Sequence, residues 1–261
     1  MDTEVTQESA AALAPHTQSI YESGSYAETN TDWHAEDAPY KAQQLLKLLQ
    51  RNRVTFRRCV DVGCGSGGVL RILASAISAE YIGFDIAPLA IERARRQGGR
   101  DITFRCENFV DCTDIADIGL VVCNDVFEHV PDYLGFLTQL GERAPRSSRY
   151  AFNIPLEMNL LHILANRHVH NRKRIGHLHY FSRATALATL SDCGFSVLDS
   201  FYTYPGLHMP HTSRSLLKQL AKIPRAALYL APGGLGEKLL GGASLLVLAE
   251  KTRPSSFPLA S

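Results

Sequence analysis

The sequence has 261 residues, of which 45% are apolar and 20% are charged. This balance is ordinary for a folded domain and excludes disorder as the state of the whole chain. The 27 Lys and Arg residues nearly cancel the 26 Asp and Glu residues, so no overall field attracts nucleic acid or an anionic membrane. One local basic segment, residues 167–174, stands out. We expect it to be a solvated loop, with contact to an anionic substrate or phosphate as the alternative.

The six cysteines include no C-x-x-C pair, and most fall in apolar runs, which favours a reducing compartment. Residues 1–15 contain three acidic and no basic residues, unlike a secretory signal. No apolar stretch reaches the length of a membrane span. The sequence therefore predicts a cytoplasmic protein without a membrane span.

In chain order, residues 1–20 show no periodicity, and we expect a loose tail there. Leucines at helical spacing then predict a helix over 38–51, with Pro39 in its first turn. Strand-like and helix-like segments alternate after that. The expected strands are 58–62, 81–86, 102–106, 120–124, 149–154, 195–204 and 243–250, and the expected helices are 68–77, 88–97, 132–142 and one from an N-cap at Ser182 to a C′ residue at Gly194. Such alternation predicts a Rossmann-like α/β fold with a mostly parallel sheet and helices on both faces.

Two segments interrupt this alternation, residues 155–180 and 205–242, because both exceed the usual length of a connection. We interpret the first as a cap insertion over the substrate site. The expected organisation is one domain over 21–251, followed by a C-terminal tail at 252–261. Within the domain we expect an N-terminal lid at 21–37, the cap at 155–180 and a second insertion at 205–242. Trp33 and His34 would act with Lys41 in the lid.

A glycine-rich loop follows the first strand, and a helix follows the loop. Glycines allow a tight turn and close backbone approach to a ligand, and the helix start presents N–H groups to it. Gly63, Gly65 and Gly68 satisfy the dinucleotide fingerprint, whereas Gly63, Gly65 and Gly67 satisfy a methyltransferase one. The loop alone leaves both readings open.

Three further features separate these readings. Asp61 lies two residues before the first glycine, and Asp85 ends the second strand, where it could accept hydrogen bonds from ribose hydroxyls. The segment 123–132 closes the fourth strand and contains Glu-His-Val-Pro-Asp. A nicotinamide oxidoreductase would need a constellation such as Tyr-x-x-x-Lys for hydride transfer, which we do not find.

With these three features, the sequence resembles the class I S-adenosylmethionine-dependent methyltransferases, in particular small-molecule members with a Glu-His-Val-Pro-Asp segment. The resemblance covers residues 33–251 and implies a seven-stranded sheet in which residues 243–250 are antiparallel. It implies S-adenosylmethionine as the cofactor. In the resemblance, Asp61 organises the loop near the ammonium group, the Asn124 carbonyl contacts the amine, and Gly63, Gly65 and Gly67 surround the methionine part. Asp85, with Ile86 next to it, contacts the ribose, and Asn108 and Phe109 border the adenine. Family members often carry Asp at the position of Asn108.

The candidate catalytic residues are histidines, because a hydroxyl acceptor needs a base and imidazole accepts protons near neutral pH. His129 follows the fourth strand and is the first candidate. His177 and His179 belong to a segment that, in the family resembled, often borders the acceptor pocket. A metal site made of His168, His170, His177 and His179 is the weaker interpretation, because no cysteine or carboxylate ligand lies near them in the sequence. We therefore expect no metal.

The favoured function is methylation of a small metabolite, or of a sugar or other glycan building block, on oxygen rather than nitrogen. An RNA methyltransferase is the runner-up, although the sequence shows no RNA-binding module or basic and aromatic platform. A non-catalytic, cofactor-binding subunit of an enzyme complex is the third possibility. The partner expected is a small-molecule acceptor, without a strong nucleic-acid signal.

Overall fold

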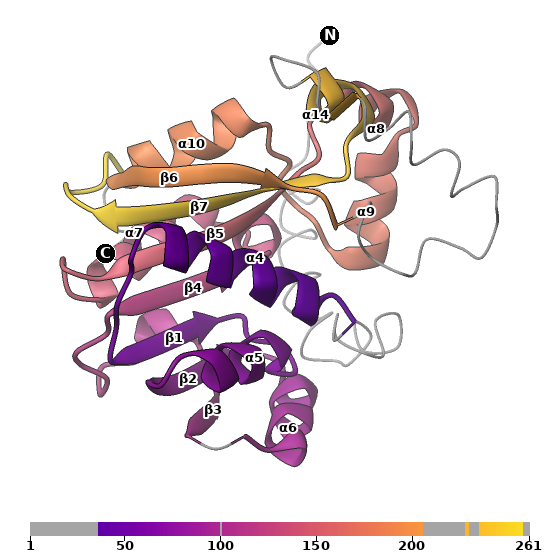
Figure 1. Ribbon diagram of the computed structural model, residues 1–261. Helices are drawn as coiled ribbons and strands as arrows, with labels where there is room; N and C mark the ends of the chain where they lie inside the picture. The colour runs from indigo at the N-terminus through magenta and orange to yellow at the C-terminus, as the bar shows by residue number, and fades with distance from the viewer. Residues whose placement is uncertain (1–35, 100, 206–227, 230–234, 258–261) are drawn as a thin grey trace, which may run out of the picture.

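The computed structural model describes residues 36–99, 101–205, 228–229 and 235–257. Its sheet has the strand order β3-β2-β1-β4-β5-β7-β6 (Figure 1). The strands are β1 (Arg58–Val62), β2 (Glu80–Asp85), β3 (Ile102–Cys106), β4 (Leu120–Asn124), β5 (Arg149–Leu156), β6 (Phe195–Thr203) and β7 (Ala243–Lys251). The expected tail at 1–20 and nearly all of the expected lid at 21–37, Trp33 and His34 included, lie outside the described residues.

The first five strands pair in parallel, and β7 pairs antiparallel with both β5 and β6. This arrangement confirms the predicted mostly parallel, seven-stranded sheet. The chain order reverses between β1 and β4, which are neighbours in the sheet although β2 and β3 intervene in the sequence. Ligands of open α/β sheets bind at such a switch point, beyond the carboxyl ends of the strands.

Helices cover both faces of the sheet. The main helices are α4 (Ala38–Arg51), α5 (Gly68–Ala76), α6 (Pro88–Gln97), α7 (Tyr133–Arg143) and α10 (Arg183–Asp192). Successive β4 residues belong to different cores: Leu120 and Val122 pack with α4, α5 and α6, whereas Val121 and Cys123 pack with α7 and α10. Side chains of a strand alternate between the faces, so a strand buried on both sides is apolar throughout.

Two helix ends follow from single residues. Ser182 caps α10 by accepting a hydrogen bond from the Thr185 amide at 3.2 Å, and the Thr185 hydroxyl accepts from the Ser182 amide at 2.9 Å. Gly194 has a φ of +83° just after α10, a conformation that glycine adopts without strain. Both residues confirm the ends predicted from the sequence and fix where β6 begins.

The cap insertion leaves the sheet after β5 and returns before α10. It contains α8 (Leu160–Leu164) and α9 (Arg167–Ile175), which lie with α14 (Leu235–Leu240) beyond the carboxyl ends of the parallel strands (Figure 1). Its two ends are joined by a parallel bridge between Leu156 and Phe181. The cap is therefore anchored at one place on the sheet.

The structure differs from the sequence-based expectation at two places in this region. The basic segment 167–174, expected to be a loop, forms most of α9. No residue of α9 is buried, so its sequence has no apolar face to signal a helix. A second difference is that β5 continues through Pro155 and Leu156, which pair with Ser244 and Ala243.

Residues 252–257 of the expected C-terminal tail pack against two helices. The Ser256 amide donates to the Asp192 carbonyl at 2.7 Å, and the Thr138 hydroxyl donates to Ser255 Oγ at 2.8 Å. These contacts tie the end of the described chain to α7 and α10. Among the described residues, no helix combines the length and apolar character needed to cross a membrane.

Candidate functional site: a cavity at the carboxyl ends of the strands

A cavity of about 720 Å³ opens at the carboxyl ends of β1, β2 and β4, within the size range of small-molecule sites. It is lined by most residues that the sequence analysis singled out. These are Asp61, Gly63, Gly65, Asp85, Ile86, Asn108, Phe109 and Asn124 of the expected cofactor site, and His129 and His177 of the expected catalytic set. Gly67 and His179 do not line the cavity that the described residues form.

The glycine loop is held by the end of β2. The Gly63 and Cys64 amides donate to the Phe84 carbonyl at 2.8 and 2.9 Å, and the Gly65 amide donates to Asp85 Oδ2 at 2.9 Å. Gly67 has a φ of +75° and begins α5, and a Cβ there would lie 2.5 Å from the Phe104 ring. Gly67 therefore shapes the turn without lining the cavity, whereas Gly63 and Gly65 line it.

Asp85 fixes the loop through both carboxylate oxygens. Besides Gly65, it accepts a hydrogen bond from the Ala87 amide at 2.9 Å. Burial raises the pKa of Asp85, and the backbone hydrogen bonds from Ala87 and Gly65 offset part of that effect. A carboxylate oxygen can accept more than one hydrogen bond, so the contact to ribose that the resemblance implies remains compatible with this geometry.

Asp61 is a buried acid without a hydrogen-bond partner for Oδ1 among the described residues. Burial and the negative charge of Asp85 raise the pKa of Asp61 to about 8, although Lys41 opposes them. An unpaired buried carboxylate is costly, and a bound cation would remove that cost. The site therefore suits the ammonium group of an amino-acid-like ligand.

The expected adenine residues differ in character. Asn108 donates from Nδ2 to Asp111 Oδ2 at 2.8 Å, on an exposed loop. Phe109 is fully buried and packs edge-on against Phe84, with 5.1 Å between ring centroids. Ile86, which lines the cavity, is 46% exposed, so its side chain is accessible to an apolar ring of a bound ligand.

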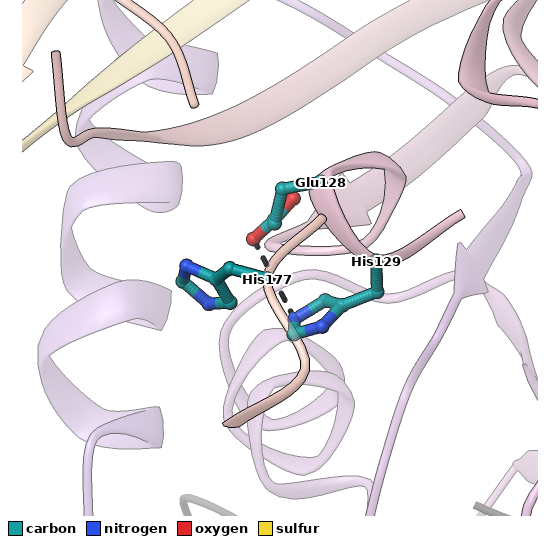
Figure 2. Close-up of side chains that lie close together, drawn as sticks. All are labelled: Glu128, His129 and His177. Carbon is teal, nitrogen blue, oxygen red and sulfur yellow. Dashed lines mark ion pairs between the residues drawn. The ribbon is translucent and has the colours of Figure 1, made fainter. Parts of the chain in front are cut away.

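The opposite end of the cavity holds Glu128, His129 and His177, which lie together in Figure 2. Glu128 and His129 belong to the short helix η2 (Phe127–His129), and His177 comes from the cap. His129 Nε2 lies 3.8 Å from Glu128 Oε1, and the two imidazole centroids are 4.7 Å apart. The Glu128 carbonyl accepts the amides of Leu178 and His179 at 2.8 and 3.1 Å, and this backbone contact brings His177 to the cavity.

Each imidazole of this pair is oriented by a second group. His177 Nδ1 donates to Glu157 Oε2 at 2.8 Å, and His129 Nδ1 donates to the Gly176 carbonyl at 3.2 Å. A carbonyl oxygen can only accept, which assigns the proton of His129 to Nδ1. The remaining nitrogen, Nε2, then carries the lone pair in each neutral ring.

His179 is placed differently from the other two candidates. Its Nε2 donates to the Val130 and Pro131 carbonyls at 3.0 and 3.2 Å, and its ring lies against Tyr133 with 4.3 Å between centroids. Burial lowers the pKa of His179. These contacts describe a residue that holds the loop after η2. The four-histidine metal set also fails to assemble, because among the described residues the cluster able to hold a metal is Glu128, His129 and His177.

Sequence reasoning missed several acidic groups around this cluster. Glu128 is fully buried, and burial together with the charge of Asp125 raises its pKa well above the ordinary value. Asp125 pairs with Lys41 at 2.8 Å and accepts a hydrogen bond from Asn153 at 2.7 Å. Glu128 could have been noticed as the residue before His129. Nothing in the sequence links Glu157 to His177, which lies 20 positions away.

The comparisons with known proteins concern the family and the fold of the chain. A family model described as "Methyltransferase domain" matches residues 34–200. The trans-aconitate 2-methyltransferase of Afipia carboxidovorans is 29% identical over 131 residues, covering 45% of this chain and 51% of that protein. The mitochondrial ubiquinone biosynthesis O-methyltransferase of Schizosaccharomyces pombe is 28% identical over 106 residues, covering 38% of each. The chain thus spans about half or less of these relatives' length.

A solved structure shares the fold at low sequence identity. The magnesium protoporphyrin IX methyltransferase of Synechocystis PCC 6803, determined with bound S-adenosylhomocysteine, superposes with a TM-score of 0.53 at 16% identity and covers 97% of this chain and 90% of that one. The family match covers well over half of the chain, and the sheet order and glycine loop agree with it. The chain belongs to the methyltransferase domain family and has the fold of the class I, S-adenosylmethionine-dependent methyltransferases.

Proposed function

We propose that this protein transfers the methyl group of S-adenosylmethionine to a hydroxyl group of a small-molecule acceptor. The observation that carries the proposal is that one cavity joins the glycine loop, the acidic residues Asp61 and Asp85, and the pair His129 and His177. A methyl donor and its acceptor must lie in line at a short distance. A single cavity with a cofactor end and an acceptor end meets that requirement.

The cofactor end would hold S-adenosylmethionine as follows. The unpaired Oδ1 of Asp61 suits the ammonium group, together with the backbone carbonyl of Asn124 at the end of β4. Asp85 binds the ribose hydroxyls while it holds the loop. Asn108 and Phe109 border the adenine. This placement directs the sulfonium towards η2.

At the acceptor end, His129 and His177 are the groups that we assign to the hydroxyl. Their Nδ1 protons are directed to Gly176 and Glu157, so each Nε2 has a lone pair to receive a proton from the acceptor. The proton leaves as the oxygen attacks the methyl carbon. His179, predicted with them, positions the loop instead.

Three features of the cap support its predicted role in the acceptor pocket. Pro155, at its start, and Ile175 and His177, near its end, all line the cavity. Protection from hydrogen exchange in the cap should therefore increase when the acceptor is added and remain unchanged when only the cofactor is added.

The atom methylated is a separate point. The ubiquinone relative is named as an O-methyltransferase, which favours oxygen over nitrogen.

Calorimetry and a methyl-transfer assay test the proposal. We expect S-adenosylhomocysteine to bind and NAD not to bind. With labelled S-adenosylmethionine, transfer should occur to a phenol or alcohol in a panel that also contains a tricarboxylic acid and a secondary amine. Binding of NAD without S-adenosylhomocysteine would overturn the cofactor. Transfer to the amine alone would overturn the hydroxyl acceptor.

A further inference from the structure

We propose that Glu128, His129 and His177 bind a divalent transition-metal ion at the acceptor end of the cavity. One ligand atom from each residue lies within 4.8 Å of the other two (Figure 2). Ligands of one tetrahedral ion are about 3.3 Å apart when each lies about 2.0 Å from the metal, so closure needs shifts of about 1 Å. The inference deepens the proposed function and depends on it only for the role of the ion.

The first observation is the state of Glu128. Its side chain is fully buried, and neither carboxylate oxygen has a hydrogen-bond partner among the described residues. An ionised carboxylate in that position lacks compensation for its lost hydration, and a protonated one has an O–H group without an acceptor. His129 Nε2, at 3.8 Å, is too distant for a hydrogen bond. A cation between these two groups would satisfy the carboxylate.

The second observation is independent of Glu128 and concerns the two rings. Metal-bound histidines almost always donate their other N–H to a carboxylate or a backbone carbonyl. His177 does so to Glu157 at 2.8 Å, and His129 does so to the Gly176 carbonyl at 3.2 Å. Both rings therefore have the tautomer that leaves Nε2 as the ligand atom. A pair of histidines serving only as packing groups would have no need of this common orientation.

The ligand types indicate which ion would bind. Two imidazoles and one carboxylate suit zinc, iron(II), manganese or cobalt, whereas magnesium and calcium prefer oxygen ligands alone. Three protein ligands leave at least one coordination position open, as in catalytic rather than structural sites. All three residues line the cavity, so the open position faces the acceptor.

An ion in this position changes how the hydroxyl is activated. The acceptor oxygen would bind the metal, which lowers the pKa of the hydroxyl so that its proton passes to solvent. A lone pair of the resulting oxyanion forms the O–C bond to the methyl group. The C–S bond breaks with its electron pair left on sulfur, so the sulfonium becomes neutral S-adenosylhomocysteine. With the ion bound, the Nε2 lone pairs of His129 and His177 are used as ligands, so the ion replaces the imidazoles as the group that activates the hydroxyl, and their role as bases belongs to the metal-free site.

Metal titration of the full chain tests the site without any turnover. The protein is treated with a chelator, dialysed, and titrated with Zn²⁺, Co²⁺ and Mg²⁺ by calorimetry, with bound metal counted by mass spectrometry. We expect one equivalent of Zn²⁺ or Co²⁺ to bind, Mg²⁺ to bind far more weakly, and the Co²⁺ complex to show the visible absorption of nitrogen ligands. Failure of Zn²⁺ and Co²⁺ to bind the chelated protein would overturn the site.

Variants assign the ligands. Glu128→Gln and His177→Ala should each weaken Zn²⁺ binding by more than 100-fold, and Glu157→Gln, which removes an orienting group, by about 10- to 100-fold. The matched control is His170→Ala, an exposed histidine of α9 and a member of the alternative four-histidine set. Each variant is first checked by circular dichroism and S-adenosylhomocysteine binding. Equal Zn²⁺ affinity in wild type and in a folded Glu128→Gln or His177→Ala variant would refute the assigned ligands.

Two outcomes separate this inference from the proposed function. Methyl transfer that continues unchanged in the chelated, metal-free protein would overturn the metal as activator and leave the methyltransferase proposal standing. One equivalent of bound Zn²⁺ that is lost in Glu128→Gln, with no transfer to any acceptor of the panel, would support the metal site and overturn the proposed acceptor class.

Discussion

Lys41 Nζ in α4 lies 2.8 Å from Asp125 Oδ2, the residue that follows β4. Burial lowers the pKa of Lys41, but the charges of Asp125, Asp37 and Glu128 outweigh it, so the net shift is upward. The ion pair thus connects α4 to the loop that bears the proposed acceptor end of the cavity. The charge of Lys41 also acts to lower the pKa values of the buried acids Asp61 and Glu128.

We expect Lys41→Met to destabilise the protein by about 2 kcal/mol at pH 7, because it leaves partly buried Asp125 without its counter-charge. Urea unfolding measures the change. Lys47→Met is the matched control on the same helix, since Lys47 is exposed and lies over the Phe201 ring. Equal stability losses in the two variants would show that the ion pair has no special weight.

Asp61 gives a pH-dependence. Its pKa in the folded protein is about 8, against an ordinary value of 3.8. The folded state therefore binds a proton that the unfolded state releases between those values, and the free energy of unfolding falls as pH rises. The slope from this group reaches about 1.4 kcal/mol per pH unit between roughly pH 5 and pH 7. In Asp61→Asn, unfolding measured across that range should show a correspondingly flatter profile.

The same residue predicts proton release on cofactor binding. The ammonium of S-adenosylhomocysteine beside Asp61 favours the ionised carboxylate, so binding at pH 7 should release a proton. Calorimetry in buffers of different ionisation enthalpy detects that proton. A binding enthalpy independent of the buffer would mean that the ammonium does not reach Asp61.

Asp85→Ala should weaken S-adenosylhomocysteine binding by about 1–3 kcal/mol, because charge-assisted bonds to the ribose and the anchor of the Gly65 amide are both lost. Titration with adenosine alone helps to divide the two effects, since adenosine contains the ribose but lacks the methionine part near the loop. An unchanged dissociation constant for both ligands would exclude Asp85 as the ribose partner.

The histidines can be ranked by single-turnover rates at saturating cofactor. His129→Ala and His177→Ala should lower the rate by about 10²- to 10⁴-fold with little change in S-adenosylhomocysteine affinity. His179→Gln keeps a donor for the Val130 and Pro131 carbonyls, and its rate should stay close to that of the wild type. A large loss in His179→Gln alone would reverse this ranking.

Most of the sheet and its helices could be predicted because apolar strands and amphipathic helices carry periodic signals. The bounds expected for α4, α6, β1, β3 and β4 agree with the structure residue for residue. The helix α9 was missed because none of its side chains is buried. A solvated helix has no apolar face, so its sequence, rich in charged residues, resembles that of a loop.

The residues around the glycine loop are easier to bring together from the sequence than those around His177. Asp61 and Asp85 lie at fixed offsets from the glycine loop, and that spacing identifies them without any structure. Glu157 and His177 meet only because the cap folds back, and the Glu128 carbonyl that holds the returning segment is a backbone group. Contacts made by an insertion of irregular length leave no repeating pattern in the sequence.

The bridge between Leu156 and Phe181 has a consequence for how such proteins diversify. Because the cap departs and returns at adjacent points, its residues can be replaced by a segment of different length without disturbing the pairing of β5 with β7. Selection can therefore remodel the proposed acceptor pocket while the strands that border the proposed cofactor end stay unchanged. Chimeras joined at Leu156 and Phe181 would be the natural way to transplant acceptor preference between members of this family.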